Sequence, residues 1–166
     1  MLKHHTHTFP IFINLDSEIL ILGSFPSVKS RENMFYYAHP QNRFFKVLSI
    51  LFNEEYSQDL TKRKDMLIKH KIALYDVIEE CDIEGSADNT ICNIKVIDIN
   101  AILKEYPNIK VIATTGSKAA SLFKKYLLDK VGDRRIYFLP STSPANAKMK
   151  LEELLEKYKV LLNKQD

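Results

Sequence analysis

Four short apolar runs along the chain are typical of buried β-strands. They are rich in Ile, Val, Leu or Tyr, and most are continuously apolar, as in strands that are covered on both faces of a sheet. The four runs are EILILGS (18–24), KIALYDVI (71–78), KVIATTG (110–116) and RIYFLPS (135–141). They predict four strands in the interior of the protein.

Helical patterns occupy the segments between these runs. After Asn42, apolar residues recur three and four positions apart on one helical face: Phe44, Val47, Leu48, Leu51 and Phe52. Further helices are predicted over 59–70, from a capping Asp98 to the residue before Pro107, over 117–128, and along a leucine-rich stripe over 151–162. Residues 28–42 show no helical pattern and predict a long functional loop.

Strands that alternate with helices predict an α/β fold, in which a parallel sheet is covered on both faces. The length of 166 residues and the hydrophobic content of 45% predict a single domain over residues 1–166. Residues 1–8 are expected to form a mobile tail, and their HHTH sequence (4–7) is otherwise a candidate metal chelator.

The sequence shows no sign of a membrane or secreted protein. No apolar run approaches the ~20 residues of a membrane span, and the first residues lack the apolar stretch of a signal peptide. We therefore expect a cytoplasmic protein. Cys81 and Cys92 lack the spacing of metal ligands and are expected to be buried or free thiols.

Positive charge is unevenly distributed along the chain, whose net charge is +3. Residues 28–46 carry +3, and residues 118–150 carry +6 from eight Lys and Arg against two Asp, so the remainder carries −6. Such asymmetry fits either a single basic face, as in nucleic-acid-binding proteins, or a set of solvated helix faces.

The segment GSFPS (Gly23–Ser27) follows the first predicted strand, at the edge of a parallel sheet where ligands bind. It matches neither a dinucleotide fingerprint nor a phosphate-binding loop with its lysine. The hydroxyls of Ser24 and Ser27 and the free amides nearby could hold a phosphate or a base carbonyl. The alternative is a plain turn that ends the strand.

The segment LPSTSPAN (139–146) follows the fourth predicted strand. Ser143 and Pro144 are typical of a helix start, with Ser as the N-cap and Pro in the first turn. Ser141 and Thr142 precede that start, and hydroxyls before a helix N-terminus are suited to a phosphate. Lys148 and Lys150 add positive charge.

The predicted loop 28–42 contains more aromatic residues than packing requires. Phe35, Tyr36 and Tyr37 lie beside a basic segment, and base stacking needs an aromatic face of this kind. The alternative is that these rings cover the core. Asn42 precedes a helix and could be an ordinary N-cap, and His39 could simply bond to the backbone.

Four segments, taken together and in order, resemble the uracil-DNA glycosylase superfamily. They are ILILGSFPS (19–27), YYAHPQNRFFKVL (36–48), DVIEECDIEGSADNTI (76–91) and LPSTSPAN (139–146). The similarity is greatest to the hypoxanthine-DNA (deoxyinosine) glycosylase branch, and more distant to mismatch-specific uracil/thymine glycosylases, which share a similar HPxNRF segment. It spans about residues 8–162.

The resemblance implies a three-layer α/β/α sandwich with a central four-stranded parallel sheet. It implies a monofunctional enzyme that flips a deaminated base out of DNA and hydrolyses its N-glycosidic bond, leaving an abasic site. We expect the protein to be a monomer. Hypoxanthine is the expected base, with uracil as a further candidate. The resemblance implies no metal and no redox cofactor.

The motifs also imply roles for individual residues. Most of the superfamily has Asp or Asn where this chain has Phe25, so the catalytic, water-positioning residue is expected to be Asn42, as in the hypoxanthine branch. Asp76 and Asp88 are reserve candidates for water activation, although Asp76 could equally be a capping or turn residue. Relatives often have Asn where this chain has Thr115, which leaves the base selectivity open.

The remaining expected contacts fall into two groups. The base-binding residues are expected to be Gly23, Ser24, Phe25, Tyr37 as the stacking platform, and His39. The residues expected at the DNA backbone and minor groove are Ser27, Ser141, Thr142, Ser143, Pro144, Ala145, Asn146 and Lys148. Two other functions stay open: an inactive nucleic-acid-binding module of the same fold, in which Phe25 marks the lost reaction, and a hydrolase of free nucleosides or nucleotides.

Overall fold

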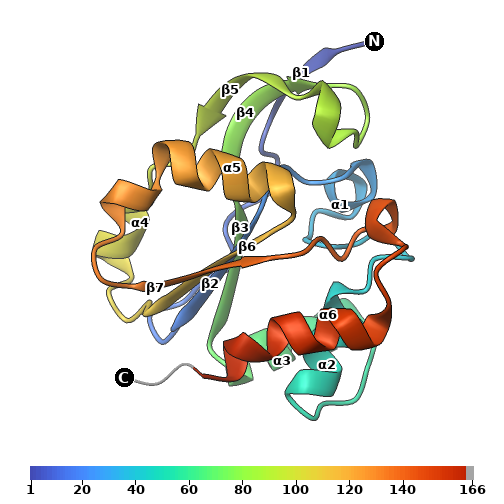
Figure 1. Ribbon diagram of the computed structural model, residues 1–166, viewed down its shortest axis with the longest axis vertical. Coiled ribbons are helices and arrows are strands. Elements are labelled where there is room, and N and C mark those ends of the chain that lie inside the picture. Colours follow the sequence, from blue (N-terminus) through green and yellow to red (C-terminus); the bar gives the residue numbers. More distant parts are fainter. Residues whose placement is uncertain (164–166) are drawn as a thin grey trace.

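A four-stranded parallel sheet forms the centre of the computed structural model, which describes residues 1–163 (Figure 1). Its strands are β2 (Ile19–Gly23), β3 (Ile72–Asp76), β6 (Val111–Thr115) and β7 (Arg135–Leu139). They lie in the order β3-β2-β6-β7. Each strand falls within one of the four apolar runs, so the predicted parallel sheet is confirmed.

Helices cover both faces of this sheet. On one face lie α2 (Phe44–Leu51), α3 (Leu60–Lys69) and α6 (Leu151–Tyr158), and on the other lie α4 (Ile99–Glu105) and α5 (Ser117–Tyr126) (Figure 1). Strand β2 supplies both cores, because Ile19 and Ile21 pack with the first group of helices whereas Leu20 and Leu22 pack with the second. This alternation of side chains confirms the predicted three-layer α/β/α sandwich.

The predicted helices correspond to elements of the structure. The Asp98 side chain caps α4 by accepting a hydrogen bond from Ala101 N–H, and Asp59 caps α3 in the same way from Lys62 N–H. Short 3₁₀ helices complete the set: η1 (Asp88–Thr90), η2 (Leu128–Lys130), η3 (Pro144–Asn146) and η4 (Lys159–Leu162).

A second, antiparallel sheet was not predicted. It has the order β1-β4-β5 and consists of β1 (Lys3–Thr6), β4 (Ile78–Ile83) and β5 (Cys92–Val96). Only Val77 separates β3 from β4, so the chain passes directly from one sheet into the other. The run that the sequence suggests as one strand over 71–78 therefore ends at Asp76 and resumes in a different sheet.

The prediction that residues 1–8 form a mobile tail is wrong. Residues 3–6 pair with residues 80–83 as strand β1. Three of the four β1 side chains are exposed, so the strand is held by backbone hydrogen bonds and leaves no hydrophobic pattern in the sequence. The HHTH residues also separate, because His4 bonds to Asp82 and Glu80 whereas His7 bonds to Asp76.

The segment 28–42 is not wholly a loop, in contrast to the prediction. It begins with the six-residue helix α1 (Val28–Asn33), which Ser27 caps by accepting a hydrogen bond from Ser30 N–H. The helix ends at Met34, which has left-handed φ of 56°. A helix of less than two turns is too short to produce a recognisable hydrophobic period.

The described residues contain neither a helix that could span a membrane nor a cluster of metal ligands. Within residues 1–163, no helix is long and apolar enough to cross a membrane. In the same part of the chain, no group of three or more His, Cys, Asp or Glu side chains is arranged to hold a metal ion.

Candidate active site

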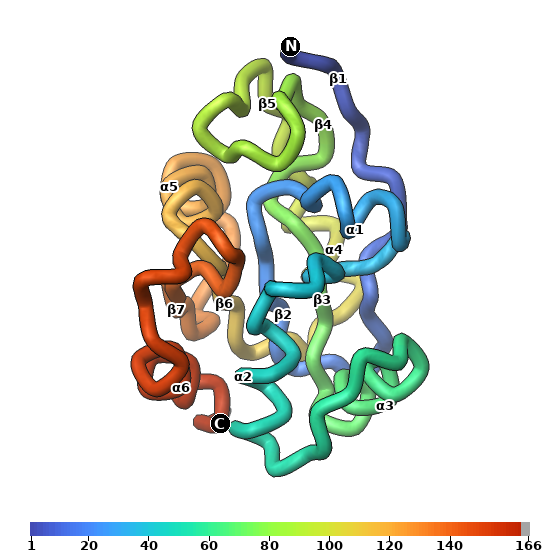
Figure 2. Tube along the Cα trace, turned by 90° about the vertical axis from the view of Figure 1, so that its right-hand side faces the viewer, coloured from blue at the N-terminus to red at the C-terminus, as the bar shows by residue number. Residues whose placement is uncertain are grey.

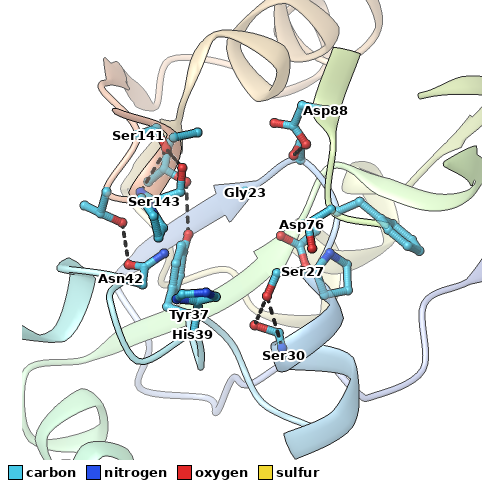
Figure 3. A pocket seen from close by; sticks show the side chains of 18 of the residues that line it. Gly23, Ser27, Ser30, Tyr37, His39, Asn42, Asp76, Asp88, Ser141 and Ser143 are labelled. Carbon is cyan, nitrogen blue, oxygen red and sulfur yellow. Dashed lines mark hydrogen bonds between the residues drawn. The ribbon is translucent and has the colours of Figure 1, made fainter. Parts of the chain in front are cut away.

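A cleft of about 660 Å³ lies at the carboxyl ends of β2, β3 and β6. Its volume is within the range of small-molecule sites, and its position is the usual ligand position in an open parallel sheet. Figure 2 looks onto this edge of the molecule, with α1 on one side and the segment before α6 on the other. Figure 3 shows Tyr37, His39 and Asn42 on one side of the pocket, and Asp76 and Asp88 on the other.

Strand β2 ends at the floor of the cleft with free backbone donors. Its pairing with β6 stops at Leu22 and Thr114. Among the described residues, none accepts a hydrogen bond from the N–H groups of Ser24 and Phe25, which follow the strand and line the cleft. These two amides can therefore donate to a carbonyl or phosphate oxygen of a ligand.

The amide group of Asn42 is fixed in one orientation. Its Oδ1 accepts hydrogen bonds from Phe44 N–H at 2.9 Å and from Thr142 Oγ1 at 2.8 Å. A backbone N–H can only donate, so the atom that faces it must be the amide oxygen and not the nitrogen. Both lone pairs of the oxygen are then in use, and Asn42 can offer the cleft only the N–H groups of Nδ2.

The capping interpretation of Asn42 is thus true in part. Its side chain bonds to the first residue of α2, but Arg43 is the residue at the N-cap position. The neighbouring His39 accepts a hydrogen bond from Gln41 N–H at Nδ1, which leaves Nε2 as the nitrogen that carries a proton in the neutral ring. Both residues line the cleft with a donor group.

Tyr37 lines the cleft, and its ring packs against Phe44. Phe44 stacks on it with ring centroids 3.8 Å apart and an interplanar angle of 15°. The Tyr37 hydroxyl lies 3.0 Å from Thr115 Oγ1, and burial raises the pKa of Tyr37, with a further contribution from the charge of Asp76. The backbone of Tyr37 has a φ of 54°, which costs a non-glycine residue about 1–3 kcal/mol and is typical of functional positions.

The other two rings of this segment belong to the core. Phe35 and Tyr36 are buried, and the Tyr36 hydroxyl donates to the carbonyl of Pro10. The alternative interpretation of the aromatic cluster is therefore correct for these two rings, although Tyr36 also lines part of the cleft.

The segment Ser141–Asn146 forms another wall of the cleft and is held by internal bonds. Ser141 Oγ donates to Ser143 Oγ and accepts from Ser143 N–H, and Asn146 Nδ2 donates to the Ser141 carbonyl. Ser143 and Pro144 start a helix as predicted, but it is the three-residue 3₁₀ helix η3, and the Ser143 side chain makes no capping bond.

Arg43 ties this wall to α2. Its guanidinium donates to the carbonyls of Met149 at 2.7 Å and Asn146 at 3.1 Å, and its backbone N–H donates to the Thr142 carbonyl. Sequence reasoning missed this role, because all three acceptors are main-chain atoms about a hundred residues away along the chain.

Two carboxylates reach the cleft from the opposite side. Asp88 Oδ1 accepts a hydrogen bond from Ser24 Oγ at 2.9 Å. Asp88 belongs to an exposed segment, but its carboxyl group lies in the cleft. Desolvation there raises the pKa of Asp88, and the hydrogen bond from Ser24 lowers it only in part. Asp76 ends β3 and is buried.

Asp76 is within hydrogen-bonding distance of His7, whose side chain is buried. Its Oδ2 lies 2.8 Å from His7 Nε2, and His7 Nδ1 lies 2.9 Å from the carbonyl of Phe9. Its Oδ1 lies close to Gly23, since a Cβ atom built on Gly23 would be only 2.5 Å from it. The sequence offered no signal for this role of His7, which falls in the expected tail.

Most of the predicted site residues meet in this cleft. The cleft is lined by all of the candidate catalytic and base-binding residues and by Ser27, Ser141, Thr142, Ser143, Pro144 and Ala145. Asn146 and Lys148 are not among the lining residues, and Phe25 both lines the cleft and packs in the core. Residues 86–89 line it too, and of these only Asp88 was a candidate.

Comparisons with known proteins agree with the sequence motifs. Residues 10–164 match the model of the Uracil DNA glycosylase superfamily. A hypoxanthine DNA glycosylase of Methanosarcina acetivorans is 31% identical over 139 residues, which are 83% of this chain and 86% of that protein. A hypoxanthine DNA glycosylase of Methanosarcina barkeri is 33% identical over 112 residues, or 67% and 71% of the two chains.

A solved structure is similar over nearly the whole length. The solution NMR structure of a candidate uracil DNA glycosylase from Methanosarcina acetivorans has a TM-score of 0.77 and 30% sequence identity. The similarity covers 93% of this chain and 96% of the other. The family resemblance inferred from the motifs is thereby confirmed, whereas the roles of single residues stay predictions.

Proposed function

The chain belongs to the uracil DNA glycosylase superfamily, a superfamily of DNA glycosylases, and on this premise we propose that it hydrolyses the N-glycosidic bond of deaminated bases in DNA. Hypoxanthine is the proposed main substrate, because both relatives named above are hypoxanthine DNA glycosylases. Uracil is the second substrate to test. The product is an abasic site.

In this proposal the damaged nucleotide leaves the helix and enters the cleft. Extruding a base costs a few kcal/mol, and least for a mispaired base such as hypoxanthine. Stacking on the Tyr37 ring, whose far side is supported by Phe44, would return about 1–3 kcal/mol. The unpaired N–H groups of Ser24 and Phe25 would donate to the O6 carbonyl of the base.

The fixed amide of Asn42 is the observation that carries the proposal. Because its oxygen already accepts two hydrogen bonds, only its N–H groups are available, and they cannot remove a proton. Asn42 would therefore hold the attacking water by donating to one of its lone pairs. A weakly activated water suffices when the sugar resembles an oxocarbenium ion at the transition state.

The segment Ser141–Asn146 would grip the DNA backbone beside the flipped nucleotide. It combines hydroxyl groups with the N-terminus of η3, and its shape is set by the bonds from Arg43. Lys148, which is exposed next to this wall, would add a charge contact to a phosphate.

One assay tests the proposed function. Duplexes that contain a single inosine, uracil, xanthine or G·T mismatch are incubated with the protein, and abasic sites are scored as strand breaks after alkali. We expect breaks at inosine, with uracil cleaved more slowly. The absence of breaks in every duplex would contradict the proposal, and salt-sensitive binding without breaks would favour the inactive binding module.

Two substitutions of Asn42 separate its two roles. Asn42→Asp keeps an oxygen for Phe44 N–H and Thr142, but replaces the donor that faces the cleft with an acceptor. We expect Asn42→Asp and Asn42→Ala both to slow single-turnover cleavage by about 100-fold or more while inosine-containing DNA is still bound. Only Asn42→Ala should also lower the melting temperature. An Asn42→Asp enzyme with the normal rate would refute the donor role.

A further inference from the structure

One proton lies between His7 and Asp76. The Phe9 carbonyl can only accept a hydrogen bond, so His7 Nδ1, 2.9 Å away, must carry a proton. His7 Nε2 and Asp76 Oδ2 are 2.8 Å apart and would repel each other if neither carried a proton. The pair therefore exists either as imidazolium and carboxylate or as neutral imidazole and carboxylic acid.

The His7 side chain is enclosed by aromatic rings. Four aromatic rings lie with their centroids within 6.0 Å of the His7 ring: those of Phe9, Phe25, Tyr36 and Tyr75. These contacts are edge-on or tilted, with interplanar angles of 42–79°, and they hold the His7 ring in place. The side chains of His7 and Asp76 are only 2% and 7% exposed, so bulk water does not compete for the contact between them.

The second carboxylate oxygen of Asp76, Oδ1, lies next to Gly23 at the edge of the cleft. The position that a Cβ atom of Gly23 would occupy lies 2.5 Å from Asp76 Oδ1, 3.5 Å from the Tyr37 hydroxyl and 3.6 Å from Thr115 Oγ1. Three side-chain oxygen atoms thus lie next to Gly23, a residue that lines the cleft. No described residue bonds to Asp76 Oδ1.

We propose that His7 is a positioning residue that holds Asp76 as a carboxylate, with Oδ1 turned to the cleft, and that Asp76 accepts the proton of the attacking water. This inference rests on the proposed function. It assigns to Asp76 the role of the Asp or Asn that most of the superfamily has where this chain has Phe25. Strand β1, which carries the chain to His7, thereby becomes part of the construction of the active site.

The step is balanced with water as the co-reactant. The water oxygen forms a bond to C1′ of the sugar as the C1′–N bond breaks, and the electron pair of that bond leaves with the base. One water proton passes to Asp76 Oδ1, and the other remains as the hydroxyl hydrogen on C1′. The proton on Asp76 then neutralises the released base anion.

Asp76 suits this task better than Asp88. The Ser24 hydroxyl already donates to Asp88 Oδ1, and Asp88 belongs to an exposed segment. Asp76 is buried, is anchored through Oδ2 and keeps Oδ1 free. The Asp76 carboxyl group is therefore held in one orientation before the substrate binds.

A double-mutant cycle tests the inference. Single-turnover cleavage of inosine-containing duplex is measured at saturating enzyme for wild type, Asp76→Asn, His7→Ala and the double variant, with the Kd for the duplex measured in parallel. We expect Asp76→Asn to slow cleavage by about 100-fold and His7→Ala by about tenfold, each with a Kd within about twofold of wild type. The double variant should be no slower than Asp76→Asn, because His7 acts through Asp76.

If His7 contributes only to packing, the cleavage rates of the variants should differ from this expectation. Loss of packing would slow the double variant further below Asp76→Asn, and that result would overturn the inference. His4→Ala is the matched control, since His4 lies on the same strand but bonds to the surface residues Asp82 and Glu80, and it should cleave at the normal rate. If His7→Ala does not fold, His7→Gln replaces it, because Gln can still donate to Asp76 Oδ2 but cannot carry a charge.

Different results would contradict the proposed function and the role of Asp76. If wild type releases no base from any duplex, the proposed function fails, and this inference fails with it. If wild type is active but Asp76→Asn cleaves within about threefold of its rate, only the inference is wrong. A large loss in Asp88→Asn, with none in Asp76→Asn, would assign the proton acceptor to Asp88 and equally overturn it.

Discussion

Replacing Gly23 with alanine places one methyl group against the Asp76 carboxylate. The new Cβ would lie 2.5 Å from Asp76 Oδ1, whereas ordinary contacts begin at 3.4 Å, so the oxygen must retreat by about 0.9 Å. The neighbouring hydroxyls of Tyr37 and Thr115, at 3.5 and 3.6 Å, are not displaced. Gly23 is not among the glycines with positive φ, so the effect comes from this one contact and not from backbone strain.

The size of the effect follows from how firmly Asp76 is held. The carboxyl group is buried and is bonded to His7 at 2.8 Å, so a shift of its Oδ1 must strain that bond or the adjacent main chain. Overpacking of this kind typically costs about 1–3 kcal/mol of stability. A reacting group that moves by ~1 Å loses about 100-fold in rate. We therefore expect a folded protein that cleaves inosine-containing DNA about 100-fold more slowly.

Chemical denaturation and single-turnover cleavage measure the two effects separately. Gly132→Ala is the control, because Gly132 has φ of 64° and only Arg134 Nη1 near its Cβ position, at 3.9 Å. It should lose about 1–2 kcal/mol through backbone strain and cleave normally. A Gly23→Ala enzyme within about threefold of the wild-type rate would refute the reactive geometry that we assign to Asp76.

Two further variants probe other parts of the cleft. Desolvation raises the pKa of Asp88, so the folded protein binds this proton more tightly than the unfolded chain, and ionisation costs stability as the pH rises above the ordinary value of 3.8. Asp88→Asn should therefore raise the melting temperature at pH 7, and this gain should disappear below pH 3.8. Thermal scans that show an equal gain at all pH values would contradict desolvation as the cause. Arg43→Gln removes the charged donor to the Met149 and Asn146 carbonyls and should cost about 2–3 kcal/mol in urea unfolding and weaken duplex binding in fluorescence anisotropy. Unchanged stability would show that the bonds from Arg43 do not hold this wall.

The central sheet could be predicted from the sequence because its strands are buried on both faces. Such strands appear as continuous apolar runs, and β2 is buried at all five positions. The second sheet gives no such signal, because β1 is mostly exposed and β5 alternates between half-buried and exposed residues. Backbone pairing alone identifies these strands, and it is not visible in a single sequence.

Most of the residues that line the cleft could be predicted, but the hydrogen bonds between them could not. Motif order located Asn42, Tyr37 and the Ser141–Asn146 segment. The second hydrogen bond to the Asn42 amide oxygen comes from Thr142, and the partner of Asp76 is His7, in a stretch with no hydrophobic pattern. Such pairs depend on how distant segments meet in the fold, and no local spacing contains that information.

The hydrogen bonds that shape the cleft join parts of the chain that are far apart in sequence. Ser24 and Asp88 are 64 residues apart, His7 and Asp76 are 69 apart, and Asn42 and Thr142 are 100 apart. Contacts of such long range require most of the chain to be ordered before they can form, which slows folding. Catalytic competence should therefore appear last during refolding, after secondary structure has formed. The enzyme's own activity would then report the final step of folding more sensitively than circular dichroism.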